Sequence, residues 1–365
     1  MATMEKDNYF PALTGIRAIA AYMVFFHHYN PFSSYQNQVR YFTDELHTGV
    51  TFFFVLSGFL IAQRYFDKQI RFKDYIFLRF ARIFPLFLVI LIGTISYNIL
   101  ILKFNVSSEM IHFLLNATLL KAFSSQFIFT GIPQAWSLSV EELFYLTAPF
   151  IFYLIKKKRI FLILAPLVLL TIGYLLYLIF HPISFYGFFD STDLIFNYTY
   201  FGRCCEFFIG IALFYLYSRY SIKIKYITWI GCLGCILGIL SISFFRDHGE
   251  LGIRHPMGML INTLLLPLLG IAPLYFGLIT ERTLLSRLLS SGVFQLLGKS
   301  SYAFYLIHLG FIFMIVNHFT ENSLINFLLI QLISIGLFKF IEEPVHKRLR
   351  SYIRRKNTLI DMNPS

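Results

Sequence analysis

The sequence predicts an all-α protein, a polytopic transmembrane helical bundle of about ten spans. Of its 365 residues, 57% are hydrophobic and only 14% are charged, and the mean hydropathy is +0.66. A soluble domain of this length needs a much larger polar surface. The formal net charge of +12 would suggest nucleic acid as the partner of a soluble protein. In a membrane protein, basic loops give a simpler reason for that charge, so we expect a lipid bilayer and no nucleic acid.

Each span needs about 20 largely apolar residues. Ten segments satisfy this requirement: 11–29, 48–66, 83–102, 138–155, 160–180, 201–218, 226–245, 260–279, 300–319 and 324–341. The first of them is short, and the fourth contains two glutamates and Pro149.

The distribution of basic residues predicts the orientation of the chain. Lysine and arginine concentrate in alternate connections, such as "KKKR" at 156–159, and in the C-terminal tail. By the positive-inside rule these segments are cytoplasmic, so the N- and C-termini are both cytoplasmic. We expect one membrane domain over 1–345 and a basic cytoplasmic tail over 346–365.

Ionisable residues inside spans are costly and therefore mark candidate functional positions. Arg17 and His28 are eleven residues apart, so in a helix they share a face about 16 Å apart along the axis. Arg17 then lies near the cytoplasmic surface and His28 toward the outer surface, whereas His27 points about 80° away from Arg17. The alternative is a pair of histidines that only ends a helix at the interface.

Two further pairs have helical spacing. Arg79 and Arg82, at i and i+3, face the same way, and their guanidinium forks suit phosphate oxygens; a basic anchor at the membrane surface is the alternative. Ser301 and His308 share one face, so both can face one cavity, although a satisfied buried histidine would also fit.

Glu141 and Glu142 are two carboxylates in an apolar helix beside Trp136. Such a pair has no inexpensive structural role in lipid, so one of them is expected to pair with Arg17, Arg203 or a histidine. A histidine base, carboxylates to orient it and cytoplasmic arginines together favour group transfer from a phosphorylated cytoplasmic donor.

Seven segments, in order over nearly the whole chain, resemble the acyltransferase-3 family of bacterial integral-membrane O-acyltransferases, which modify cell-surface polysaccharides and lipid-linked glycans. They are "YFPALTGIRAIAAYMVFFHHYNP", "GVTFFFVLSGFLIAQRY", "FLRFARIFPLF", "QAWSLSVEELFYLTAPFIF", "FGRCCEFFIGIALFY", "LGKSSYAFYLIHLGF" and "FIEEPVHKRL". Many members have an acidic residue where this chain has Thr51. Some members carry a fused esterase-like domain, for which this sequence has no room, so a standalone transferase is expected.

The resemblance implies roles for individual residues. The catalytic set would be His28, Glu141, Glu142 and Arg17, and the donor-binding set Arg79 and Arg82. The substrate-binding or supporting set would be Trp136, Ser139, Tyr145, Arg203, Glu206, Ser301, Tyr302 and His308. His28 would act as general base or carry the acyl group, and Glu141 or Glu142 would orient its imidazole.

The implied reaction moves an acetyl group from cytoplasmic acetyl-CoA to a hydroxyl of a cell-envelope glycan in the bacterial inner (cytoplasmic) membrane. The acceptor class stays open among lipopolysaccharide O-antigen, exopolysaccharide and lipid-linked oligosaccharide. We expect no permanently bound cofactor and no metal. The alternatives are a polytopic glycan transporter or flippase, for which repeated halves with broken spans would be typical, and a membrane scaffold, which so many buried charges disfavour.

Overall fold

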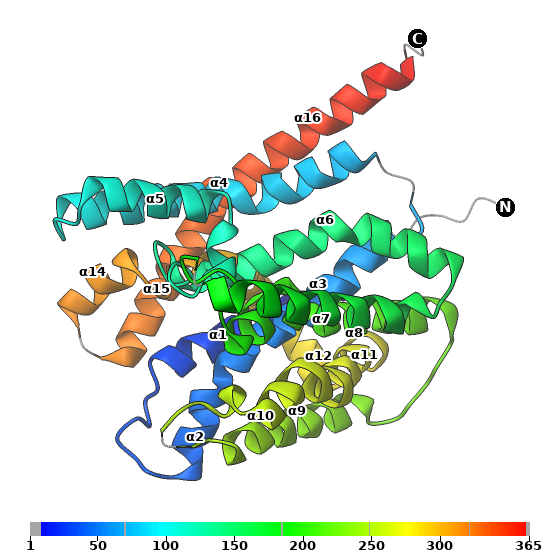
Figure 1. The fold of residues 1–365 in the computed structure, drawn as a ribbon. Helices are drawn as coiled ribbons and strands as arrows, with labels where there is room; N and C mark the ends of the chain where they lie inside the picture. Colours follow the sequence, from blue (N-terminus) through cyan, green and yellow to red (C-terminus); the bar gives the residue numbers. More distant parts are fainter. Residues whose placement is uncertain (1–8, 69–70, 184, 248, 321, 363–365) are drawn as a thin grey trace.

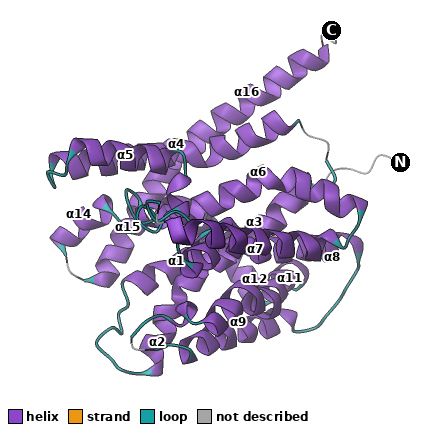
Figure 2. Ribbon diagram, in the orientation of Figure 1, coloured by secondary structure: helices purple, strands orange, loops and turns teal. Residues whose placement is uncertain are grey.

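A computed structural model describes residues 9–68, 71–183, 185–247, 249–320 and 322–362, with side chains placed as far as Tyr352. The described part is helical throughout, without a β-strand, as Figure 2 shows. This confirms the predicted fold class. The first eight residues of the predicted membrane domain and the last three of the predicted tail lie outside the described residues.

Sixteen α-helices make up the described part, joined by loops and short 3-10 or π segments. They are α1 (Pro11–His28), α2 (Gln38–Asp44), α3 (Gly49–Tyr65), α4 (Phe72–Leu100), α5 (Val106–Ala117), α6 (Trp136–Lys157), α7 (Phe161–Phe180), α8 (Tyr200–Arg219), α9 (Ile227–Phe244), α10 (Pro256–Leu260), α11 (Ala272–Thr280), α12 (Leu284–Leu289), α13 (Gly292–Ile307), α14 (Phe311–Phe319), α15 (Ser323–Leu337) and α16 (Glu343–Met362).

Among the described residues, eight helical segments are long and apolar enough to cross a membrane, or nine if the bent pair α13 and α14 is one span. The remaining member of the predicted ten, α1, is not among them, since Arg17, His27 and His28 reduce its hydropathy. It packs along α3 and α13 inside the bundle, so it does not need a fully apolar surface.

The predicted span 300–319 is not a continuous helix. Helix α13 ends at Ile307, and α14 leaves it at an angle of 92°. Gly310 stands at the bend with φ of 90°, a left-handed conformation that glycine adopts without steric penalty. The break places His308 at a helix end instead of in a helix interior.

The C-terminal helices run together without a gap. α15 continues through a π segment (Phe338–Glu342) into α16. α16 packs beside α4 and projects away from the bundle (Figure 1). The predicted boundary at 345/346 therefore falls inside a helix.

Close approach of α3 and α8 fixes the centre of the bundle. A Cβ atom added to Gly58 would lie 2.1 Å from the backbone oxygen of Phe207, and one added to Gly210 would lie 2.1 Å from that of Val55. Small residues that let helix backbones touch are typical of membrane helix pairs. The contact also fixes the position of Ser57, which precedes Gly58 on α3.

We expect Gly58→Ala to destabilise the fold, because the methyl group meets backbone that cannot rotate away. Overpacking of this kind costs about 1–3 kcal/mol. Thermal unfolding of the purified protein in detergent measures the effect. Gly336→Ala is the matched control, because a Cβ there meets nothing within 4 Å. Equal stability of the two variants would contradict the packing argument.

Lys121 organises the connection between α5 and α6. Its side chain is fully buried, and its ammonium group donates to the backbone oxygens of Thr130, at 2.9 Å, and Ile132. Burial lowers the pKa of this ammonium group to about 7, because the charged form loses its hydration. Lys121 therefore links two backbone oxygens of this loop, and its burial favours the uncharged amine.

This burial predicts a pH dependence of stability. Between pH 7 and about 10 the unfolded chain keeps the Lys121 proton and the folded chain has lost it, so the free energy of unfolding rises with pH by up to about 1.4 kcal/mol per pH unit. Lys121→Met should lose this rise relative to wild type. Denaturation at pH 7 and pH 9 checks it, with exposed Lys103→Met as the control. If the free energy of unfolding depends on pH equally in wild type, Lys121→Met and Lys103→Met, the rise does not come from Lys121.

Candidate functional site

A cavity of about 1420 Å³ lies between α1, α3, α4, α6, α8, α11 and α13. At one end its lining residues are exposed, among them Arg64, Arg219 and Lys223. At the other end they are buried, among them Ser137 and Tyr305. The cavity thus reaches from the protein surface into the bundle.

The cavity lining is strongly basic. Among the described residues, eight basic side chains line it and Glu141 is the single carboxylate; the basic residues are Arg17, Arg64, Lys68, Arg79, Arg82, Arg219, Lys223 and Arg350. A smaller cavity of about 510 Å³ shares Arg219 and Tyr220 with it and adds Lys156 and Arg159. A concave site with one sign of charge attracts ligands of the opposite sign, so the chemistry favours a polyanion.

Arg79 and Arg82 both line the cavity, as their spacing predicts. Arg79 is buried, and its guanidinium donates to the Tyr65 hydroxyl at 3.0 Å. It also lies over the rings of Tyr65 and Tyr145, at 5.3 and 5.8 Å from their centroids. These contacts hold the planar group in one orientation, which suits recognition of a phosphate.

The two adjacent glutamates have different surroundings. Glu141 lines the cavity and accepts hydrogen bonds from Ser57, at 2.5 Å, and from the Tyr145 hydroxyl. Glu142 is buried, and its Oε1 has no hydrogen-bond partner among the described residues. Only Glu141 can therefore touch a ligand in this cavity.

Arg17 and His28 lie on one uninterrupted helix, as predicted. Arg17 lines the cavity, but His28 is exposed and is not part of the lining. The expected contact between His28 and Glu141 or Glu142 is not formed. Glu141 binds Ser57 and Tyr145, whereas the His28 ring lies 4.6 Å from that of His27 and 5.4 Å from that of His308, between centroids.

His308 is fully buried at the end of α13. Its Nδ1 lies 2.7 Å from the backbone oxygen of Tyr305. A carbonyl only accepts, so Nδ1 carries the proton and Nε2 keeps a lone pair. Nε2 has no hydrogen-bond partner among the described residues, and this free lone pair can act as a base.

Ser301 and His308, which the sequence predicts to face one cavity, do not line the basic cavity. The Ser301 hydroxyl donates to the Gly298 backbone oxygen, and neither residue lines the cavity. Its neighbour Tyr302 does line it and donates to the Ile83 backbone oxygen at 2.9 Å. The reason is that Ser301 bonds back into its own helix, while the bend after Ile307 turns the chain away.

Arg203 and Glu206 form a buried ion pair of 2.6 Å behind the cavity wall. Arg203 also donates to the Thr51 hydroxyl at 2.9 Å and lies over the rings of Phe54 and Trp136. Position 51, where many related sequences have an acid, thus adjoins a guanidinium whose charge Glu206 balances here. Ser139 is buried on the same helix as Trp136, outside the cavity lining.

Sequence reasoning missed several lining residues. Ser57 binds Glu141, and Tyr305 lies 2.8 Å from the Ser137 hydroxyl at the buried end. Both stand in apolar spans, where a hydroxyl gives only a weak signal. Lys68, Arg219 and Arg350 were visible in the sequence, but only as markers of a cytoplasmic loop or tail.

Comparison with known proteins identifies the family of the chain. Residues 10–339 match a family model described as an acyltransferase domain. "Putative O-acetyltransferase SACOL0978" of Staphylococcus aureus (strain COL) is 26% identical over 380 aligned residues, covering 94% of this chain and 58% of that protein. O-acetyltransferase OatA of Staphylococcus aureus (strain NCTC 8325 / PS 47) is 23% identical over 377, with the same coverage. The chain thus spans less than two thirds of the length of these relatives.

No solved structure matches the chain. The family model nevertheless covers most of its length, and five of the seven quoted sequence segments lie wholly within the matched residues, while the first begins one residue before them and the last directly after them. The chain belongs to the acyltransferase-3 family of acyltransferase domains.

Proposed function

We propose that the protein is an integral membrane O-acetyltransferase that moves an acetyl group from acetyl-CoA to a hydroxyl of a cell-envelope glycan. The observation that carries the proposal is the basic cavity, which begins among exposed cations and reaches Arg17 on α1, the helix that ends at His28. Two relatives are named O-acetyltransferases, which supports the acetyl group as cargo.

The donor enters at the exposed end of the cavity. Acyl-CoA combines an anionic nucleotide end with a flexible arm that ends in a thioester. Arg79 and Arg82 hold its phosphates through charge-assisted hydrogen bonds. The arm then extends toward the buried end, which Ser137 and Tyr305 line with hydroxyls that are 2.8 Å apart and that both donate to the Gln134 backbone oxygen.

The acceptor reaches the other end of α1. His28 is exposed there, about 16 Å along the helix from Arg17. Its imidazole takes the proton of the acceptor hydroxyl as that oxygen attacks the thioester carbonyl. The C–S bond breaks, the thiolate takes the proton, and the products are an acetyl ester and free CoA. His308, whose ring lies beside His28, stands between this base and Tyr305 at the buried end of the cavity.

The acceptor belongs to the bacterial envelope, as an O-antigen, an exopolysaccharide or a lipid-linked oligosaccharide. The predicted orientation puts the basic cavity mouth on the cytoplasmic side of the inner membrane, where acetyl-CoA is made. His28 then lies toward the opposite side, where such glycans are exposed.

The activity itself is testable in membranes supplied with acetyl-labelled CoA. We expect label in envelope glycan with wild-type protein, and background incorporation with His28→Ala, because the base is lost. His318→Ala, an exposed histidine on α14, is the control and should transfer normally. No incorporation by wild type would overturn the proposed function, and wild-type turnover in His28→Ala would remove the base assignment.

Donor binding predicts a second result. Arg82→Ala should raise the KM for acetyl-CoA about 10-fold or more, because a hydrogen bond to a charged group contributes about 1.5–3 kcal/mol. Arg287→Ala removes an exposed arginine outside the cavity and should leave this KM unchanged. Steady-state kinetics at saturating acceptor separates the two. The phosphate assignment fails if both variants keep the wild-type KM.

A further inference from the structure

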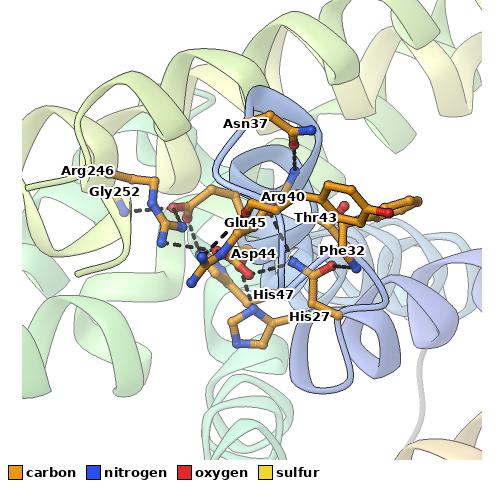
Figure 3. A network of polar contacts seen from close by, with 12 residues as sticks. His27, Phe32, Asn37, Arg40, Thr43, Asp44, Glu45, His47, Arg246 and Gly252 are labelled. Atoms are coloured by element: carbon orange, nitrogen blue, oxygen red, sulfur yellow. Dashed lines mark hydrogen bonds and ion pairs between the residues drawn. The ribbon is translucent and has the colours of Figure 1, made fainter. Parts of the chain in front are cut away.

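A second polar cluster lies around the end of α1 that carries His28, and none of its residues belongs to the basic cavity (Figure 3). It joins α1 to the short helix α2, to the 3-10 turn Glu45–Thr48 and to the connection between α9 and α10. Its buried carboxylate is Glu45, whose side chain is fully enclosed. A buried charge of this kind needs compensating partners.

Three donors surround the Glu45 carboxylate. Oε1 accepts from the backbone N–H of Gly252 at 2.8 Å and from the Arg246 guanidinium at 3.2 Å. Oε2 lies 2.9 Å from Nε2 of His47. An ionised carboxylate only accepts, so His47 carries its proton on Nε2 when it is neutral. Figure 3 shows the three donors converging on this one side chain.

Three imidazole rings lead from this carboxylate to the proposed catalytic base, and a fourth lies beyond it. The His47 ring lies 5.3 Å from that of His27, the His27 ring 4.6 Å from that of His28, and the His28 ring 5.4 Å from that of His308, between centroids. His27 is held in place because its Nδ1 donates to the Asp44 backbone oxygen. Among the described residues, no group of histidine, cysteine and acidic side chains is placed to hold a metal ion.

The enclosed charges around these rings are negative in sum. Asp44 and Glu45 are mostly or fully buried, and Arg246, the enclosed cation beside them in the described part of the chain, is shared between them at 3.1 and 3.2 Å. Arg40 approaches Asp44 at 3.7 Å, but its side chain is 34% exposed, so solvent screens it. A proton arriving on the row of imidazoles therefore meets two carboxylates that Arg246 and the partly exposed Arg40 compensate only in part.

We propose that Glu45, acting through His47 and His27, is the positioning residue that stabilises the protonated form of His28 during acyl transfer. It takes the role that the sequence favours for Glu141 or Glu142; Glu141 lies at the basic cavity, bonded to Ser57 and Tyr145, and Glu142 is buried outside the cavity lining. The inference rests on the proposed function, because it needs His28 as the base. The carboxylate needs no contact with substrate, since its charge acts over short distances in a poorly solvated cluster.

Glu45→Gln tests the proposal. The amide keeps the shape and an acceptor oxygen but removes the charge. We expect kcat for acetyl transfer to fall about 10-fold or more, the loss typical of a weakened acid–base group. The KM for acetyl-CoA should stay at the wild-type value, because the donor cavity is elsewhere.

The pH profile separates this role from a structural one. Without the negative charge His28 holds its proton less firmly, so the acidic limb of the kcat/KM profile should move to lower pH. The groups around the base are His27, His47 and His308, with Asp44, Arg246 and Arg40 around the row of imidazoles, and the substitution changes none of them. Glu45→Asp should restore part of the turnover and should return the acidic limb of the pH profile toward its wild-type position, because the negative charge is present again.

Glu250→Gln is the matched control, a carboxylate paired with Arg254 in the same connection and more than half exposed. It should match wild type in turnover and pH profile. If Glu45→Gln does not accumulate as folded protein, His47→Gln makes the same test, since it breaks the link between the carboxylate and His27.

The outcomes are distinct. A fall in turnover with an unmoved pH profile would mean that Glu45 only supports the fold, and would overturn the proposal. Unchanged turnover in Glu45→Gln would also overturn the proposal. No acetyl transfer by wild type would instead refute the proposed function.

Discussion

The structure depends on one constraint, namely that a charge inside an apolar bundle must have a partner or reach water. Three of the interior ionisable groups that sequence singles out satisfy it through neighbouring side chains. Arg79 is held by two tyrosines, Glu141 by a serine and a tyrosine, and Arg203 by Glu206 and Thr51. Helices pack closely enough for such pairs to form because glycines such as Gly58 allow backbone contact.

The same constraint separates the molecule into two polar regions. The basic cavity gathers cations that a polyanionic donor would neutralise, so it needs only one carboxylate. The cluster beyond the far end of α1 gathers imidazoles and carboxylates, which suit proton transfer. α1 joins the two regions, and its polar residues at both ends explain why it is less apolar than the other helices while being buried among them.

Much of this arrangement could be predicted from sequence, because helical periodicity is local. The helical class, the shared helix of Arg17 and His28 and the shared cavity of Arg79 and Arg82 follow from spacing alone. The partner of His28 could not be predicted, because Glu45 and Glu141 both stand in or beside apolar spans and only tertiary packing decides which lies nearer. The bend at Gly310 was also missed, since a single glycine inside an apolar run is weak evidence of a break.

The bend has a chemical consequence that a straight span would not have. In a continuous helix the Tyr305 carbonyl would accept from the backbone N–H four residues later. Because α13 stops at Ile307, that carbonyl is one of the unsatisfied groups of a helix end, and the His308 ring donates to it. This fixes the proton on Nδ1 and leaves the Nε2 lone pair free in a ring that lies beside His28. A break in the backbone thereby selects the tautomer that a proton-accepting histidine requires.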